Sequence, residues 1–204
     1  DKISGLSPVI AIEQKSTNKN PRSTVGTITE IYDFLRLLYA RAGEAYSYET
    51  GEKMVKYTEE QIINLILEKF EGKACYILAP IVKGRKGHYK ELFEQIRRKG
   101  FISVRVNGEF VELTHGFKLD RYKTHFIEIL IDKLRVKSED RKRLRESIQL
   151  AMKHGKGVTM LMDKDTEDVK YYSKLLMCPT TGLSYNEPAP HTFSFNSPAG
   201  ACAR

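Results

Sequence analysis

The feature that most constrains the fold is a long alternating segment, FIEILIDKLRV, at residues 126–136. Apolar residues that alternate with charged ones indicate a β-strand whose two faces differ in environment, and the length of this segment is typical of a strand near the centre of a sheet. A second alternating segment, residues 101–113, has Asn107-Gly108 at its middle, which is the strongest short-range signal for a two-residue β-hairpin turn. The sequence therefore predicts a sheet organised around residues 126–136.

Helical patterns alternate with further strand patterns along the chain. Thr58-x-x-Gln61 has capping-box spacing and precedes an apolar stripe that Gly72 ends. Apolar residues at helical spacing predict further helices at 27–43, 88–99 and 138–154. Short apolar runs predict strands at 53–57, 74–82, 158–162 and 169–177, and the basic segment 83–87 is predicted to be a loop. These elements predict an α+β fold with a mixed sheet and about four helices.

The composition limits the classes of function. The chain of 204 residues carries 34 Lys and Arg against 26 Asp and Glu, and this excess of positive charge suits an acidic or polyanionic partner. No apolar run is long enough to span a membrane, and no basic-then-apolar start indicates a signal peptide. Three widely spaced cysteines, Cys75, Cys178 and Cys202, argue against a secreted disulfide scaffold and for a reducing cytoplasm.

The sequence contains no motif for catalysis. No G-x-x-x-x-G-K-[ST] phosphate loop and no LSGG-type signature occur, so we expect that this chain does not hydrolyse ATP. The histidines have no nearby serine or cysteine that would form a nucleophilic pair, which argues against a hydrolase. We therefore expect no catalytic residue and no cofactor in this chain.

The two ends of the chain carry the most specific patterns. Residues 9–12 form an apolar run that predicts a buried strand, Gln14 follows it, and Thr27-x-x-Glu30 has the capping-box spacing of a helix that ends at Gly43. The blocks SPVIAIEQK and NPRSTVGTITEIYDFLRLLYAR resemble the start of the first signature domain of the UvrA family. The block TFSFNSPAGAC at 192–202 resembles the segment that leads into this family's first zinc-finger-like element.

The resemblance implies a domain organisation and a function. Residues 1–45 would begin an ABC-type signature domain, residues 46–175 would be the UvrB-binding domain inserted into it, and residues 176–204 would return toward the signature domain. Members of the family are cytoplasmic bacterial ATPases that form homodimers, detect damaged DNA and load UvrB onto it in nucleotide excision repair, with ATP, Mg²⁺ and zinc as cofactors. On this basis we expect the chain to be a piece of a longer protein that binds UvrB.

The resemblance also implies roles for individual residues. Gln14 corresponds to the Q-loop glutamine that senses bound nucleotide in ABC proteins, although a surface glutamine at the end of a strand explains the same pattern. The first C-x-x-C pair of the zinc-finger-like element reads Cys178-Pro-Thr-Thr181 here, so a hydroxyl replaces one thiolate. Cys178, His191 and Cys202 are the possible metal ligands, and they are too few and too irregularly spaced for a closed zinc site. We expect no stoichiometric zinc in this chain.

The residues leave more than one binding surface open. Charged side chains of both signs on the predicted strands would share one side of the sheet and suit a polar protein interface, at Arg105, Glu109, Asp132, Lys133 and Arg135. An ordinary solvated sheet face explains the same residues. A second hypothesis is direct binding of nucleic acid through the basic segments 83–90, 97–99 and 141–145. A third is a UvrA-like paralogue that serves drug export or resistance.

Overall fold

The computed structural model describes Gly5 and residues 24–201. The chain divides into two compact units. One, which we call the flanking unit, combines residues 1–43 with residues 188–204, and the other, the sheet unit, comprises residues 44–187. The strand predicted at 9–12, Gln14 and Cys202 lie outside the described residues.

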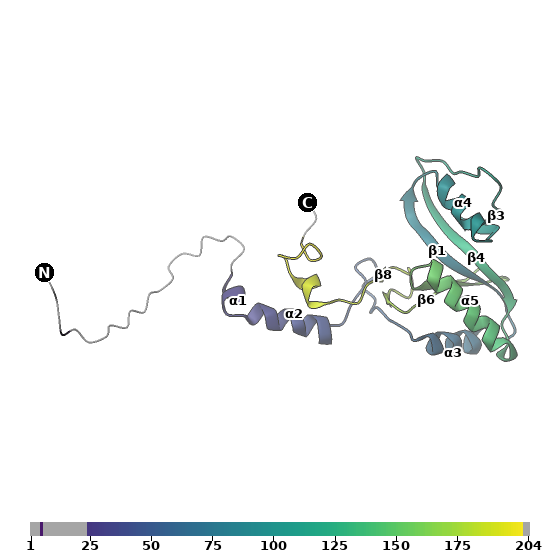
Figure 1. Ribbon diagram of the computed structural model, residues 1–204. Coiled ribbons are helices and arrows are strands. Elements are labelled where there is room, and N and C mark those ends of the chain that lie inside the picture. Colours follow the sequence, from purple (N-terminus) through teal and green to yellow (C-terminus); the bar gives the residue numbers. More distant parts are fainter. Residues whose placement is uncertain (1–4, 6–23, 202–204) are drawn as a thin grey trace. The chain divides into compact units, whose positions relative to one another are not determined.

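A six-stranded sheet forms the centre of the sheet unit (Figure 1). Its strands follow the spatial order β3-β2-β4-β1-β5-β6, with the bounds β1 (Ala74–Lys86), β2 (Ser103–Val106), β3 (Glu109–Glu112), β4 (Thr124–Arg135), β5 (Val158–Asp163) and β6 (Val169–Ser173). The predicted central strand is confirmed, because β4 lies between β2 and β1. The predicted hairpin is also confirmed, since Asn107 and Gly108 both have positive φ, as a type I′ turn requires.

The α+β class is confirmed, but every strand pairing in this sheet is antiparallel and the sheet is not mixed. The reason lies in the connections. The chain passes from β1 through a helix to β2, and from β4 through a helix to β5. Each crossover skips one position in the sheet, so strands of the same direction are separated by a strand of the opposite direction.

Strand β1 departs most from the sequence prediction. It continues through Pro80 and through the basic segment predicted as a loop, since Arg85 and Lys86 still pair with the start of β4. Three register shifts interrupt the pairing of β1 with β4, and Gly84 has a φ of 61°. Such bulges bend a strand and increase its twist, which lets a long strand accommodate a proline without ending.

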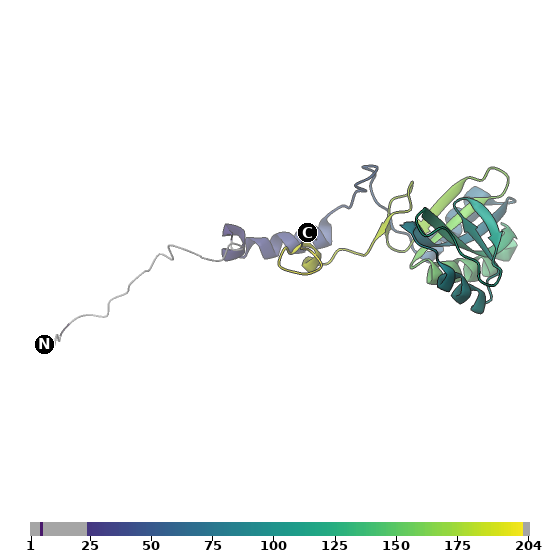
Figure 2. The same cartoon turned by 90° about the horizontal axis from the view of Figure 1, so that it is seen from above.

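Three helices cover one face of the sheet: α3 (Glu59–Phe70), α4 (Lys90–Arg98) and α5 (Arg141–His154). Figure 2 shows them gathered on one side of the strands. The predicted capping box is confirmed, because the Gln61 N–H donates to Thr58 Oγ1 at 3.3 Å and the Thr58 N–H donates to Gln61 Oε1 at 2.8 Å. Ser138 does not belong to the helix that the sequence predicted at 138–154, because α5 begins at Arg141. It begins a short 3₁₀ helix, Ser138–Asp140, and donates to Glu71 instead.

The hydrophobic core lies between these helices and the sheet. Alternate residues of the strands, such as Ile77, Ile127 and Ile129, join apolar residues of all three helices in one buried cluster. The opposite face of the sheet carries a smaller cluster of buried residues, made of Leu78, Leu130, Met160 and Met162. The sheet is therefore apolar on both faces, and only one of them is covered by helices.

The chain enters and leaves the sheet unit along paired segments. Val55 and Met177 exchange backbone hydrogen bonds of 2.9 Å in both directions, and the Tyr57 N–H donates to the Ser173 carbonyl at 2.9 Å. The segment 53–57, predicted as a strand, contributes isolated bridges at Lys53 and Val55. The predicted strand 169–177 divides after Ser173 into β6 and β7 (Leu176–Met177), and β7 pairs with β8 (Ser184–Tyr185).

The flanking unit contains α1 (Val25–Ile28), α2 (Ile31–Ala42) and the 3₁₀ helix η2 (Pro190–Phe193). Its capping box joins Thr24 and Thr27, not Thr27 and Glu30 as predicted, because Glu30 adopts a left-handed conformation that separates α1 from α2. Gly43 ends α2 as predicted.

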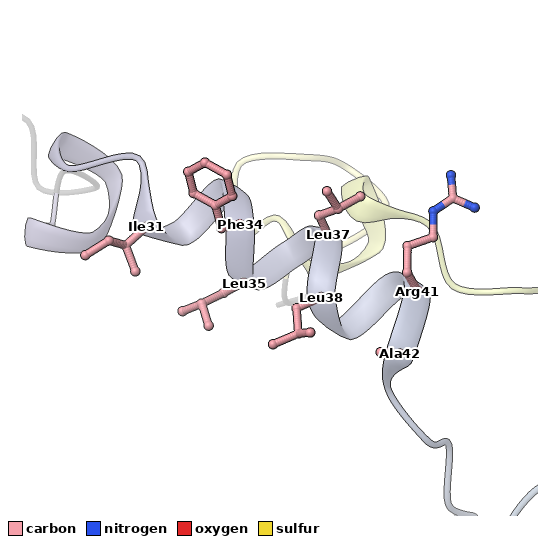
Figure 3. A pocket seen from close by; sticks show the side chains of 7 residues that line it. All are labelled: Ile31, Phe34, Leu35, Leu37, Leu38, Arg41 and Ala42. Carbon is pink, nitrogen blue, oxygen red and sulfur yellow. The ribbon is translucent and has the colours of Figure 1, made fainter.

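One face of α2 contacts the C-terminal segment. Tyr32 hydrogen-bonds the carbonyl of Phe193, and its ring lies 5.2 Å from that of Phe195. The other face lines an apolar hollow (Figure 3), where the large side chains are between 43% and 71% exposed: Ile31, Phe34, Leu35, Leu37 and Leu38. Among the described helices, none is both long and apolar enough to cross a membrane.

Candidate functional site

The five charged residues predicted to share one side of the sheet lie on two sides. Residues directly opposite each other in an antiparallel pair point to the same face. Glu109 pairs with Val106, which faces the core, and Asp132 accepts hydrogen bonds from α5. Lys133 instead pairs with Tyr76, on the face without helices. The predicted single face of mixed charge is wrong, because a register shift at Ile131 inverts the alternation just before Asp132.

Asp132 connects the sheet to a helix. Its carboxylate accepts hydrogen bonds from Arg143 at 2.8 and 3.1 Å and from the Ser147 hydroxyl at 2.8 Å. Burial raises the pKa of Asp132, but the hydrogen bonds from Arg143 and Ser147 outweigh that effect and hold its pKa below the usual range. Arg135 is likewise engaged within the chain, since it donates to the carbonyl of Gly72 at 2.8 Å. Asp132 therefore joins β4 to α5 within the chain.

The face without helices carries a cluster that we call the aromatic–basic patch, made of the exposed Phe110 and Lys133 and the half-buried Tyr76 and Arg105. The rings of Tyr76 and Phe110 lie 4.9 Å apart, and Lys133 Nζ lies 5.6 Å from the centre of the Tyr76 ring. Arg105 stands opposite Phe110 in the hairpin. Strands β3 and β1 are three strand spacings apart, about 14 Å in a flat sheet, so this ring contact shows that the sheet curls toward the patch.

Arg105, a member of the patch, forms a charged pair with the buried Glu128. Glu128 stands opposite Arg105, with 3.8 Å between Arg105 Nη1 and Glu128 Oε2, and this oxygen is buried without a hydrogen-bond partner among the described residues. Burial raises the pKa of Glu128 to about 7, although Arg105 and Lys83 act to lower it. Lys83 is also affected by burial, which lowers its pKa, and its ammonium group donates to the Gly182 carbonyl at 2.5 Å. Arg105 is thus held in place by a carboxylate beneath it.

The basic segments differ in whether carboxylates contact their positive charges. In segment 141–145, Arg141 and Arg145 both contact the carboxylate of Glu60, and Arg143 contacts Asp132. In contrast, Lys83, Arg85 and Lys156 line a hollow of about 470 Å³ whose described lining contains no carboxylate. The sequence did not indicate this hollow, because it joins the far end of β1, predicted as a loop, to the turn after α5.

The candidate metal ligands do not form a zinc site in the described part of the chain. Cys178 belongs to the sheet unit, His191 belongs to the flanking unit, and no group of three or more His, Cys, Asp or Glu side chains comes together among the described residues. The groups around the Cys178 sulfur are the hydroxyls of Thr181, Thr50 and Ser47 and the carboxylate of Glu52. One thiol and one carboxylate are too few for a closed four-ligand zinc site, and hydroxyls bind zinc poorly, so this set of donors does not fit the metal. Sequence analysis missed Ser47 and Thr50.

The fold and the patch together define a small α+β domain with an aromatic and basic surface on the sheet face that carries no helices. Residues 57–165 match the family model described as the UvrA interaction domain. The chain is 46% identical over 206 residues to UvrABC system protein A of Methanothermobacter thermautotrophicus, 47% identical over 202 residues to that of Bacillus subtilis, and 42% identical over 204 residues to that of Thermus thermophilus. The chain belongs to the UvrA family.

These alignments cover nearly all of this chain but a small part of each relative. Each includes 99% of this chain and 21% of the relative, so the chain spans about a fifth of the length of the proteins it resembles. The family match at 57–165 falls entirely within the sheet unit, residues 44–187.

Proposed function

We propose that the sheet unit binds UvrB, and that the chain serves nucleotide excision repair as part of an ABC-type ATPase that forms homodimers, recognises damaged DNA and acts in the bacterial cytoplasm. The observation that carries this proposal is the match of residues 57–165 to the UvrA interaction domain, which lies within a unit that has its own core and its own paired incoming and outgoing segments. A unit of this kind can fold alone, so the isolated sheet unit should retain the binding activity. The names of the relatives favour repair over the drug-resistance alternative.

The aromatic–basic patch is the surface that best fits a protein partner. Protein interfaces are enriched in aromatic residues and arginine, and their strongest contributions come from such residues at the centre of the contact. Phe110 is 41% exposed and Lys133 is exposed, so both can reach a partner without rearrangement of the sheet. The positive charge of the patch suits a partner with acidic residues at the matching surface.

The direct test is calorimetry of the purified chain with UvrB, without DNA and without nucleotide. We expect a one-to-one complex that weakens as salt is raised, because charged groups steer the encounter. The variant Lys142→Ala is expected to bind UvrB as the unaltered chain does, since Lys142 is an exposed lysine on α5, away from the patch. Absence of any complex with UvrB would contradict the proposal.

Direct binding of nucleic acid is the second candidate, and one observation favours it: the hollow lined by Lys83, Arg85 and Lys156 lacks carboxylates among its described residues. Segment 141–145 loses support, because its arginines already contact Glu60 and Asp132. If the nucleic-acid hypothesis holds, the chain will bind duplex DNA at physiological salt, and Arg85→Ala with Lys156→Ala will weaken that binding and reduce its salt dependence.

The chain itself is expected to bind no ATP. The 204 residues contain no phosphate loop, and the Q-loop candidate Gln14 would contact nucleotide only together with such a loop. Calorimetry with ATP and Mg²⁺ should therefore show no binding at micromolar concentrations, and a phosphate-release assay should show no turnover. Measurable affinity that is lost in a Gln14→Ala variant would contradict this expectation.

A further inference from the structure

Two turns with the same geometry lie where the chain enters and leaves the sheet unit. In the first, the Gly51 N–H donates to the Ser47 carbonyl at 2.8 Å, and in the second, the Gly182 N–H donates to the Cys178 carbonyl at 2.9 Å. The two glycines have φ values of 70° and 66°, in the region that favours glycine. Each turn places two side chains with two residues between them, Ser47 with Thr50 and Cys178 with Thr181. This is the spacing that zinc-binding turns use for their ligand pairs.

The four side chains meet at the sulfur of Cys178. Thr50 Oγ1 lies 3.4 Å from Cys178 Sγ, and the hydroxyls of Thr181 and Ser47 lie near enough to the same sulfur to affect its pKa. Cys178 is fully buried and Ser47 is 2% exposed. Burial raises the pKa of Cys178, but the three hydroxyls outweigh it and lower the pKa. Two pairs of side chains, one from each turn, thus have the sequence spacing of a structural zinc site, but they supply one thiol and three hydroxyls in place of four strong ligands. The Glu52 carboxylate, which accepts from the Cys178 thiol at 3.5 Å, lies outside the two pairs.

We propose that this thiol–hydroxyl cluster replaces a structural metal ion and joins the two turns by hydrogen bonds alone. The chemistry supports the replacement of metal coordination by hydrogen bonds. A buried hydroxyl needs only a hydrogen-bond partner, whereas a zinc ion needs thiolate, imidazole or carboxylate ligands. The neighbouring backbone supplies the rest of the connection, through the bridges between Tyr46 and Lys53 and between Val55 and Met177. The join between the turns is therefore independent of metal in this chain, while the sequence spacing of a metal site is retained.

Restoring thiols at the three hydroxyl positions should create a zinc site. The variant Ser47→Cys/Thr50→Cys/Thr181→Cys is expected to retain about one zinc per chain after dialysis against a weak chelator, and to give a tetrahedral Co²⁺ spectrum with thiolate-to-cobalt charge-transfer bands. The matched control is Tyr48→Cys/Glu49→Cys/Thr180→Cys, which adds the same number of thiols to the same turns at exposed positions between the cluster residues. This control is expected to retain no zinc.

The unaltered chain provides the second arm of the test. We expect it to contain no stoichiometric zinc and to keep the same Tm with and without EDTA, and we expect Cys178→Ser to leave its Tm nearly unchanged because a hydroxyl can take part in the same hydrogen bonds. About one zinc per unaltered chain, or a Tm that falls on chelation, would overturn the proposal. A folded Ser47→Cys/Thr50→Cys/Thr181→Cys variant that binds no zinc would overturn it too. If that variant does not fold, the measurements on the unaltered chain decide the question.

Discussion

Lys133→Glu is expected to weaken binding of the chain to UvrB by about two powers of ten, and Phe110→Ala by about one. Lys133 lies against the Tyr76 ring, which in turn contacts Phe110, so a partner seated on the patch would cover all three side chains. Charge reversal at a covered position replaces an attraction by a repulsion, and removal of a central aromatic ring leaves a gap in the contact. Calorimetry at two salt concentrations would measure both effects.

Arg105 is a less clear test of the same surface than Lys133. Removal of Arg105 would leave the Glu128 carboxylate buried without its charged neighbour, so a loss of binding could follow from a disturbed fold. Lys142→Glu is the better control for Lys133→Glu, since it makes the same change of charge on an exposed face of α5. If Lys142→Glu abolished binding while Lys133→Glu bound normally, the assignment of the surface would be wrong.

Glu128→Gln is expected to stabilise the protein by up to about 3 kcal/mol at pH 8 and by less than about 1 kcal/mol at pH 5. Burial raises the pKa of Glu128 from 4.5 to about 7 in the folded state. The unfolded chain loses this proton near pH 4.5 while the folded chain keeps it, so the stability contributed by the protonated carboxyl is fully present below pH 4.5. It declines as pH rises and is lost above about pH 7. An amide does not titrate and avoids this loss.

Thermal or urea unfolding at the two pH values would measure the effect of Glu128→Gln. Glu109→Gln makes the same change of side chain at an exposed position on β3 and serves as the matched control. A change in unfolding free energy that is the same at both pH values would show that Glu128 is ionised in the folded protein throughout this range. The buried position of its Oε2 atom would then need another explanation.

The elements that the sequence predicted well are those set by neighbouring residues. The Asn107-Gly108 turn, the cap at Thr58 and the strand at residues 126–136 each depend on preferences within a few residues, and all three are found in the structure. The direction of the strands was not predicted, because it depends on which strands become neighbours after each helical crossover. That choice is made by packing between distant segments.

The arrangement of the candidate site was also not predicted, because it depends on contacts between distant segments. Alternation alone would place Asp132 on the same face as Glu128, but the bulge at Ile131 turns Asp132 toward Arg143 and Ser147. A one-residue shift in pairing exchanges the two faces of a strand, and nothing in the local sequence marks where the shift occurs. Likewise, the Cys178 motif was visible in the sequence, while its partners Ser47 and Thr50 are more than a hundred residues away and carry no metal-binding side chains.

The hydrogen bonds between Val55 and Met177 reduce the entropic cost of the sheet unit to the folding of the flanking unit. Closing a chain into a loop costs entropy that grows with the logarithm of the number of free residues. Because the sheet unit brings its own two ends together through these bonds, the flanking unit has only the short segments outside them to close. A large domain inserted in this way is, for its host, thermodynamically equivalent to a surface loop. It could be shortened, exchanged or moved to another protein with little effect on the folding of the segments on either side.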